Sequence, residues 1–126
     1  MTSVTVEFDP VSKITAAIGR GRVTASDLLA ALDAFYDNAP TLLALCDLSD
    51  ADLGSLTTEE LGRIVQSTER RAEVRRGGKT AIAAPGDLEY GMARMYEILA
   101  DAHAHPVTIR AFRRREEALL WLREES

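Results

Sequence analysis

The chain has 126 residues, of which 46% are hydrophobic, and carries a formal net charge of −5 at pH 7. This length and composition predict one domain over residues 1–126 with a true hydrophobic core. The negative charge disfavours binding to nucleic acid or to an anionic membrane, because long-range repulsion opposes both encounters. A single cysteine allows no intrachain disulfide, and we expect a soluble, cytoplasmic protein without a targeting or membrane-spanning segment.

Alternating apolar side chains at the start of the chain predict a β-hairpin formed by residues 4–8 and 14–18. Thr24 and Asp27 have the spacing of a capping box, which begins a helix that ends at Pro40. The chain therefore opens with two antiparallel strands followed by one helix.

A short apolar run, residues 41–47, predicts a strand that is buried on both faces and reaches water at its carboxyl end. We expect its cysteine, Cys46, to be a small buried hydrophobic residue. Thr57 and Glu60 form a second capping box, and a long amphipathic helix follows it up to a Gly-Gly break at residues 77–78.

The last third of the chain repeats this pattern. Residues 79–84 predict a second buried strand, and residues 107–112 and 116–124 predict the last strand and a short helix. A third helix lies between the strands at 79–84 and 107–112, and its predicted buried stripe comprises Leu88, Met92, Met95 and Leu99. The order ββαβαβαβα predicts an α/β fold with a mixed, mostly parallel sheet and four helices.

Two groups of residues have side chains of the types that can bind metals. Asp47, Asp50 and Asp52 follow the first buried strand and could hold a divalent cation, although acidic residues before a helix more often cap turns and the helix itself. His103 and His105 lack a third imidazole or a thiolate nearby in the sequence, and they form a weak ligand set. We predict no metal and no cofactor.

Four arginines in the second long helix, at positions 70, 71, 75 and 76, are interleaved with Glu69 and Glu73. This pattern predicts a solvated helix face with local ion pairs rather than a phosphate-binding surface.

Gly91 lies inside the third predicted helix, where glycine costs up to about 1 kcal/mol relative to alanine. It could allow a ligand or a partner to approach the backbone closely. Tyr90 and Arg94 lie off the predicted buried stripe, and they could line a pocket or a subunit contact, or simply cover the surface.

The element order, together with three segments, resembles the STAS domain of bacterial anti-sigma-factor antagonists. The segments are Leu45-Cys46-Asp47-Leu48-Ser49 ahead of a helix, Lys79 to Pro85 ahead of the Tyr90 to Tyr96 helix, and the closing Phe112 to Leu122. The resemblance is to the SpoIIAA-like branch of small stand-alone proteins, which is related in fold to lipid-binding CRAL-TRIO domains. It implies a ligand-binding or protein-interaction module, often dimeric, without catalytic residues.

Antagonists that act as phosphorylation switches carry a serine at the start of the helix after this strand, in an Asp-Ser-Ser-Gly-like sequence. Here Asp52 matches the aspartate, but Leu53 and Gly54 replace the serines and Ser55 comes one position late. This departure from the pattern argues against the kinase-switch role.

We predict the ligand site where the ends of the two buried strands border one crevice. The free amides at the start of the third helix, from Gly86 to Glu89, would bind an anionic head group, unless Asp87 caps the helix itself. An apolar pocket would hold the rest of the ligand. The predicted ligand-binding residues are Asp47, Ser49, Leu53, Gly86, Asp87, Tyr90, Gly91 and Arg94.

We favour a non-enzymatic regulatory or carrier-like module that binds a small apolar or amphipathic molecule, or a partner protein, at the carboxyl ends of its strands. One alternative is an anti-sigma-factor antagonist that acts by protein–protein interaction, with Ser49 or Ser55 as a displaced phosphosite. Another is a small metal-dependent hydrolase built on Asp47, Asp50 and Asp52.

We also predict a homodimer, because aromatic side chains are enriched at interfaces. The aromatic residues that support this prediction are Tyr36, Tyr90, Tyr96 and Trp121. The sequence predicts no nucleic-acid partner and no integral membrane contact.

Overall fold

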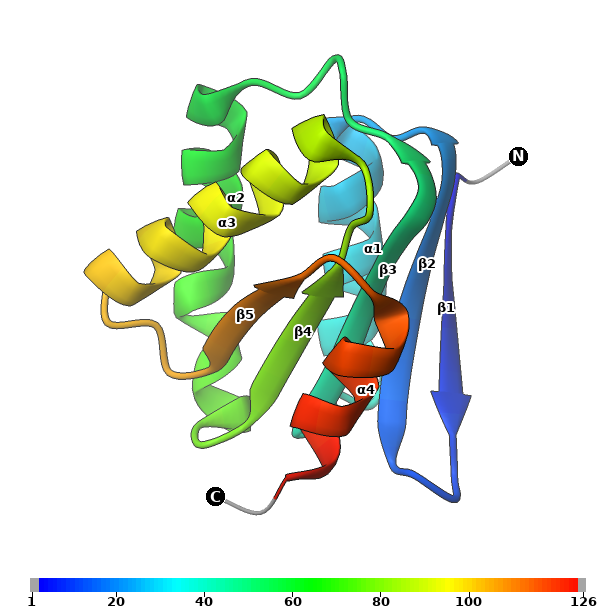
Figure 1. Cartoon of the computed structure of the whole chain (residues 1–126). Coiled ribbons are helices and arrows are strands. Elements are labelled where there is room, and N and C mark those ends of the chain that lie inside the picture. Colours follow the sequence, from blue (N-terminus) through cyan, green and yellow to red (C-terminus); the bar gives the residue numbers. More distant parts are fainter. Residues whose placement is uncertain (1–2, 125–126) are drawn as a thin grey trace.

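The computed structural model describes residues 3–124, which form five strands and four α-helices (Figure 1). In chain order the elements are β1 (Val4–Asp9), β2 (Ile14–Arg22), α1 (Ala25–Asp37), β3 (Leu43–Asp52), α2 (Thr58–Glu69), the 3-10 helix η1 (Arg71–Arg75), β4 (Lys79–Ala83), α3 (Asp87–Ala102), β5 (Thr108–Phe112) and α4 (Arg115–Arg123). The predicted α/β fold and its element order are confirmed. Within residues 3–124 no helix is both long and apolar enough to cross a bilayer.

The sheet has the strand order β1-β2-β3-β4-β5, with β1 antiparallel to β2 and the other pairs parallel. Each parallel pair is joined through a helix, and each connection moves one position in the same direction across the sheet. Because such crossovers are right-handed, α1, α2 and α3 must share one face of the sheet. Helix α4 follows the last strand and covers β3 and β4 from the opposite face (Figure 1).

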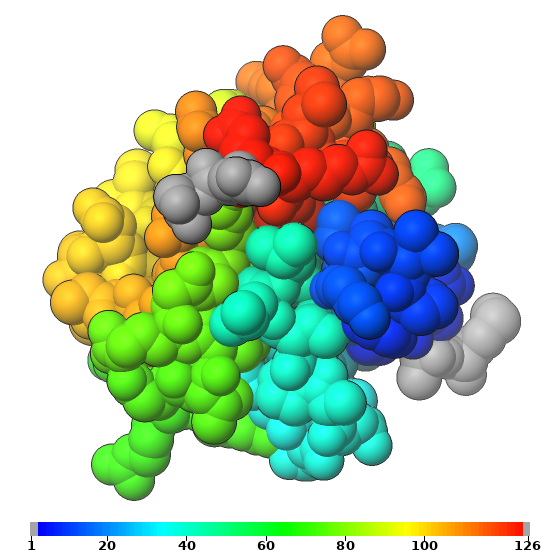
Figure 2. Space-filling model, turned by 90° about the horizontal axis from the view of Figure 1, so that it is seen from below, coloured from blue at the N-terminus to red at the C-terminus, as the bar shows by residue number. Residues whose placement is uncertain are grey.

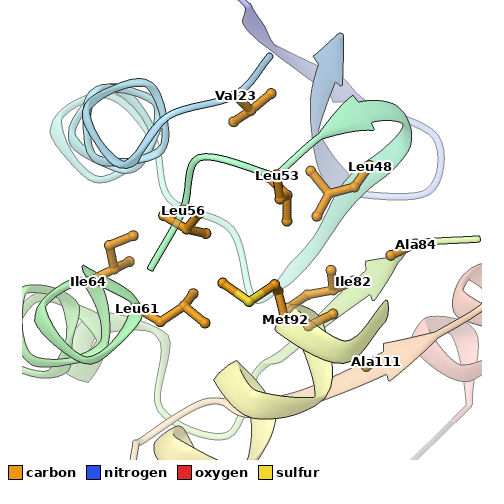
Figure 3. Close-up of a cluster of buried hydrophobic side chains, with 11 residues drawn as sticks. Val23, Leu48, Leu53, Leu56, Leu61, Ile64, Ile82, Ala84, Met92 and Ala111 are labelled. Carbon is orange, nitrogen blue, oxygen red and sulfur yellow. The ribbon is translucent and has the colours of Figure 1, made fainter. Parts of the chain in front are cut away.

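The sheet therefore separates two hydrophobic cores, and successive residues of β3 face opposite ones. Figure 3 shows the core on the helical face, where side chains from β3, the loop after it, α2, β4 and α3 point toward one another. Its larger members are Val23, Leu48, Leu53, Leu56, Leu61, Ile64, Ile82 and Met92. The core under α4 comprises Ile14, Leu45, Ala81, Ala83, Ala118, Trp121 and Leu122.

Both predicted capping boxes are present and set the starts of α1 and α2. Thr24 Oγ1 accepts from the Asp27 amide at 3.2 Å, and Asp27 Oδ2 accepts from the Thr24 amide at 2.9 Å. The corresponding distances for Thr57 and Glu60 are 3.1 and 2.9 Å. Each box satisfies two amides that the first helical turn would otherwise leave unpaired.

Strand β3 continues well past its predicted end at residue 47. The extension pairs with β2 beyond an irregularity near Gly19, and it places Arg20 beside Asp50 and Arg22 beside Asp52. Opposite charges on neighbouring strands stabilise a pairing that an apolar pattern does not reveal.

The predicted buried stripe of α3 is wrong in two positions, because Leu88 is 52% and Met95 is 37% exposed. The helix packs against β5 and α2, and this orientation buries Met92 and the small residues Ala93 and Ala100. Small side chains let the helix approach the sheet closely, so the larger ones face outward.

Candidate ligand-binding cavity

A cavity of about 140 Å³ lies between the sheet and the helical layer. Its wall is almost entirely hydrocarbon, and it is formed by strands β1 to β4, the loop after β3 and the three helices on that face. An engineered apolar cavity of about 150 Å³ in another protein stays dry and binds benzene. A space of this size and lining therefore admits a small apolar molecule.

The cavity exists because its floor consists of small side chains placed side by side. The strand register aligns Thr15, Ala44 and Thr80 in one row across β2, β3 and β4. The next row on the same face contains Ala17 and Cys46, followed by the larger Ile82. Small residues at neighbouring positions on adjacent strands leave space that larger residues would fill.

Helix α1 covers this floor without packing tightly onto it. Its side chains Leu28, Leu32 and Phe35 line the cavity, yet none of the 13 described residues of α1 is buried. The apolar face of the helix thus lies over open space, which accounts for its incomplete burial.

Cys46 is only partly buried, because its side chain lines the cavity rather than a filled core. It remains in apolar surroundings. Burial, with a smaller contribution from the neighbouring Asp47 carboxylate, raises the pKa of the Cys46 thiol to about 12. The thiol is therefore protonated at neutral pH, which agrees with its predicted role as a small hydrophobic residue.

One end of the cavity carries a positive charge, on Arg75. Arg75 was predicted on a solvated face, but it is 4% exposed and lines the cavity. Its Nε donates to the Thr41 carbonyl at 2.6 Å, and Nη2 donates to Thr80 Oγ1 at 3.0 Å. Its guanidinium also lies 5.0 Å from the centre of the Phe35 ring.

Arg75 lies at the amino ends of β3 and β4, opposite the edge where the site was predicted. Seen from below in Figure 2, the chain around residue 40 (cyan) lies beside the region of the turn that precedes β4 (lime green). The two segments are joined by the hydrogen bond from the Lys79 amide to the Leu42 carbonyl, at 2.8 Å.

At the carboxyl end of the sheet, Asp47 and Ser49 are used within the protein. The buried Asp47 carboxylate accepts from the Ser49 amide at 3.0 Å and from Arg115 Nη1 at 2.6 Å. Burial by itself would raise the pKa of Asp47, but the bonds from Ser49 and the Arg115 guanidinium outweigh it and hold that pKa below its usual value.

The start of α3 is also closed by the protein's own side chains. Arg113 Nη1 donates to Asp87 Oδ1 at 2.6 Å, and its guanidinium lies 4.3 Å from the centre of the Tyr90 ring. The Glu89 carboxylate lies against Gly86 and accepts from the Leu53 amide at 3.1 Å. A carboxylate of the protein thus lies where an anionic head group was predicted.

Gly91 and Arg94 lie on the outer side of α3. A side chain at Gly91 would meet nothing within 4 Å, and Arg94 pairs with Glu97 at 2.6 Å. Of the eight predicted binding residues, all within the described part of the chain, Leu53 alone lines the cavity.

The residues considered for metal binding are not brought together. Among residues 3–124 no group of three or more His, Cys, Asp or Glu side chains is arranged to hold a metal ion. Asp52 Oδ1 accepts from the Gly54 amide at 2.8 Å, and His105 Nδ1 accepts from the Val107 amide at 3.1 Å. Both are capping arrangements of loops.

The aromatic residues behind the predicted homodimer take part in contacts within the chain. Tyr36 accepts a hydrogen bond from Arg75 Nη1 at 3.3 Å, Tyr96 lines the cavity, and Trp121 is buried against Phe112. Tyr90 lies under Arg113. The homodimer stays a prediction that these contacts do not support.

No protein-family model matches the chain, and a comparison with curated proteins found no significant match. Among solved structures the chain is similar to an uncharacterised protein of the DUF3478 family with a SpoIIAA-like fold, from Shewanella loihica PV-4. The two share 18% sequence identity over 94% of this chain and 91% of that chain, with a TM-score of 0.57. This likeness confirms the predicted SpoIIAA-like fold.

Proposed function

We propose that this SpoIIAA-like domain is a non-enzymatic module that binds a small apolar or amphipathic molecule in the cavity under α1. The observation that carries the proposal is the floor of small side chains, Thr15, Ala17, Ala44 and Cys46, beneath a helix whose apolar residues line the same space. Empty apolar space costs stability, since its lining forgoes contacts that a filled core would make. A bound molecule restores those contacts.

The size of the cavity limits the ligand. With about 140 Å³ of space, it accepts one aromatic ring or a chain of about five or six carbons, and a long-chain lipid would not fit without rearrangement. The proposed ligand is thus a metabolite-sized molecule.

A matched pair of variants in α1 tests the proposal. Ala31 lines the cavity, whereas its neighbour Ala30 is exposed. Ala31→Phe would place a phenyl ring in the cavity, and Ala30→Phe would place the same ring in solvent. Toluene and pentan-1-ol serve as neutral probes, and binding is followed by protein NMR and by the rise in Tm.

We expect both probes to shift the resonances of residues around Cys46 in the wild-type protein and in Ala30→Phe. We expect neither probe to do so in Ala31→Phe. An unchanged spectrum of the wild-type protein at millimolar probe would contradict the proposal.

Partner binding is the second candidate function, because the SpoIIAA-like fold is consistent with a protein-interaction module. Ser49 and Ser55 are exposed, so a kinase could reach both hydroxyls. Mass spectrometry of protein isolated from its native host, with and without phosphatase treatment, tests for phosphate on either serine. Ser49→Ala and Ser55→Ala variants then assign the site.

A further inference from the structure

The acceptors around the Arg75 guanidinium are unevenly distributed over its nitrogens. The guanidinium carries five N–H groups. Nε donates to the Thr41 carbonyl, and the two hydrogens of Nη2 are shared among Thr80 Oγ1 and the carbonyl oxygens of Leu42 and Lys79. Nη1 carries two hydrogens, but the Tyr36 hydroxyl at 3.3 Å is its one acceptor within residues 3–124. One N–H of a buried cation is thus left without an acceptor.

The charge of Arg75 is also uncompensated. None of the ion pairs formed among residues 3–124 includes Arg75. Its neighbours differ, because Arg71 pairs with Asp33 and Arg76 pairs with Glu73. Burying a charge is costly unless a counter-charge offsets it. The cavity beside Arg75 is where an external anion could lie.

Thr80 supplies a second donor next to the guanidinium. Its Oγ1 accepts from Arg75 Nη2, and its own hydrogen has no acceptor among the described residues. The other hydroxyl of this row is occupied, since Thr41 Oγ1 donates to the Leu43 carbonyl and Thr15 must therefore donate to Thr41. The spare hydrogens of Arg75 and Thr80 thus flank the same end of the cavity.

We propose that the ligand of this cavity is a small monocarboxylate. One carboxylate oxygen accepts from Arg75 Nη1, the other accepts from the Thr80 hydroxyl, and the hydrocarbon body lies over Ala17 and Cys46. This inference rests on the proposed function and specifies its ligand class. Two donors and one positive charge match two oxygens and one negative charge, whereas a phosphate dianion would remain half compensated. Hydrogen bonds to a charged acceptor are about twice as strong as neutral ones.

Pentanoate and pentan-1-ol, which share their chain length and differ in the head group, test the inference. We expect pentanoate to bind the wild-type protein at least about tenfold more tightly at pH 7, measured by NMR titration. With a 13C label on its carboxyl group, bound pentanoate is expected to titrate at a lower pH than free pentanoate, because the buried guanidinium favours the ionised form. A merely structural arginine would produce neither result.

Two variants locate the head group. Thr80→Val keeps the shape of the side chain and removes its hydroxyl, so it should weaken pentanoate binding several-fold and leave pentan-1-ol binding unchanged. The matched control is Thr108→Val, at an exposed threonine of the adjacent strand β5. Arg75→Lys should retain a preference for the acid, and Arg75→Met should abolish it if the variant folds.

The outcomes separate this inference from the proposed function. If pentan-1-ol binds as tightly as pentanoate and Thr80→Val changes neither affinity, the carboxylate site is overturned and the apolar cavity stands. If neither compound perturbs residues around the cavity in the wild-type protein, both proposals fail. Because the acid and alcohol are compared in the wild-type protein, the test does not depend on how Arg75→Met folds.

Discussion

Arg115, in the first turn of α4, donates to Asp47 in β3, 68 positions earlier in the chain, with 2.6 Å between Nη1 and Oδ2. The contact joins the helix on one face of the sheet to the middle of its central strand. Arg115 therefore binds the carboxylate of a residue that the sequence predicted to be part of the ligand site. A potential binding group is thus a part of the structural framework.

Arg115→Gln should lower the free energy of unfolding by about 1–2 kcal/mol at pH 7. The substitution removes the ion pair with Arg115, so the buried Asp47 carboxylate keeps only its hydrogen bonds from Ser49. The pKa of Asp47 is lowered in the folded state, so this stabilisation is present above pH 3.8 and is lost as the pH falls below it. Urea denaturation at pH 7 and pH 3 measures both effects. The control Arg114→Gln, at an exposed residue, should change stability by less than about 0.5 kcal/mol.

Leu45→Ala should cost about 2–5 kcal/mol of unfolding free energy, since Leu45 is 1% exposed in the core under α4. The same substitution at Leu120, which is 64% exposed on α4, should cost less than about 0.5 kcal/mol. Chemical denaturation of both variants provides the comparison. Similar costs at the two positions would place Leu45 outside the core.

Cys46 should react slowly with a thiol reagent in the folded protein, because burial raises its pKa to about 12. It is the single cysteine of the chain, so the labelling reports on this position alone. Reaction requires a transient opening of the structure, so the rate should rise steeply in denaturant. Stopped-flow labelling with a chromogenic disulfide measures it. Labelling as fast as that of a free thiol in the absence of denaturant would show that solvent enters the cavity freely.

His105 should make the protein less stable in mild acid. Burial lowers the pKa of His105 despite the nearby Glu69 carboxylate, and its Nδ1 accepts from the Val107 amide, so protonation would break that bond. The unfolded state takes up a proton near pH 6.5 and the folded state does so only at lower pH. Unfolding free energy should therefore fall below about pH 6.5, by up to about 1.4 kcal/mol per pH unit.

Two variants assign that pH dependence. His105→Asn keeps an acceptor for the Val107 amide and removes the titration, so its stability should vary less between pH 7.5 and pH 5.5. His103→Gln, at the more exposed histidine, should retain the wild-type dependence. Identical slopes in the wild-type protein and His105→Asn would assign the effect to other groups.

The fold could be predicted because its signals are local. Thr24 with Asp27, and Thr57 with Glu60, lie three residues apart, and the same hydrogen bonds form wherever a helix begins at such a pair. The apolar run ending at Asp47 likewise marks a central strand without reference to its neighbours. Where β3 ends depends instead on its pairing with β2, and a single segment does not contain that information.

The cavity could not be predicted, because it too depends on how separate segments pair. Ala17, Ala44 and Cys46 are ordinary small residues in the sequence, and the strand register is what places them together. Arg75 belongs to a charged run that is typical of a solvated helix face. The change from α2 to the tighter η1 alters the helical phase, and it directs this arginine toward the ends of β3 and β4.

The incomplete burial of α1 also has a consequence for how the molecule opens. A helix with few tight apolar contacts separates from the sheet at a smaller free energy than global unfolding requires. Its backbone amides should therefore exchange with deuterium well before those of β3 and β4, which lie between two cores. The sheet and α4 would then persist as one cooperative unit while α1 unfolds and refolds against it.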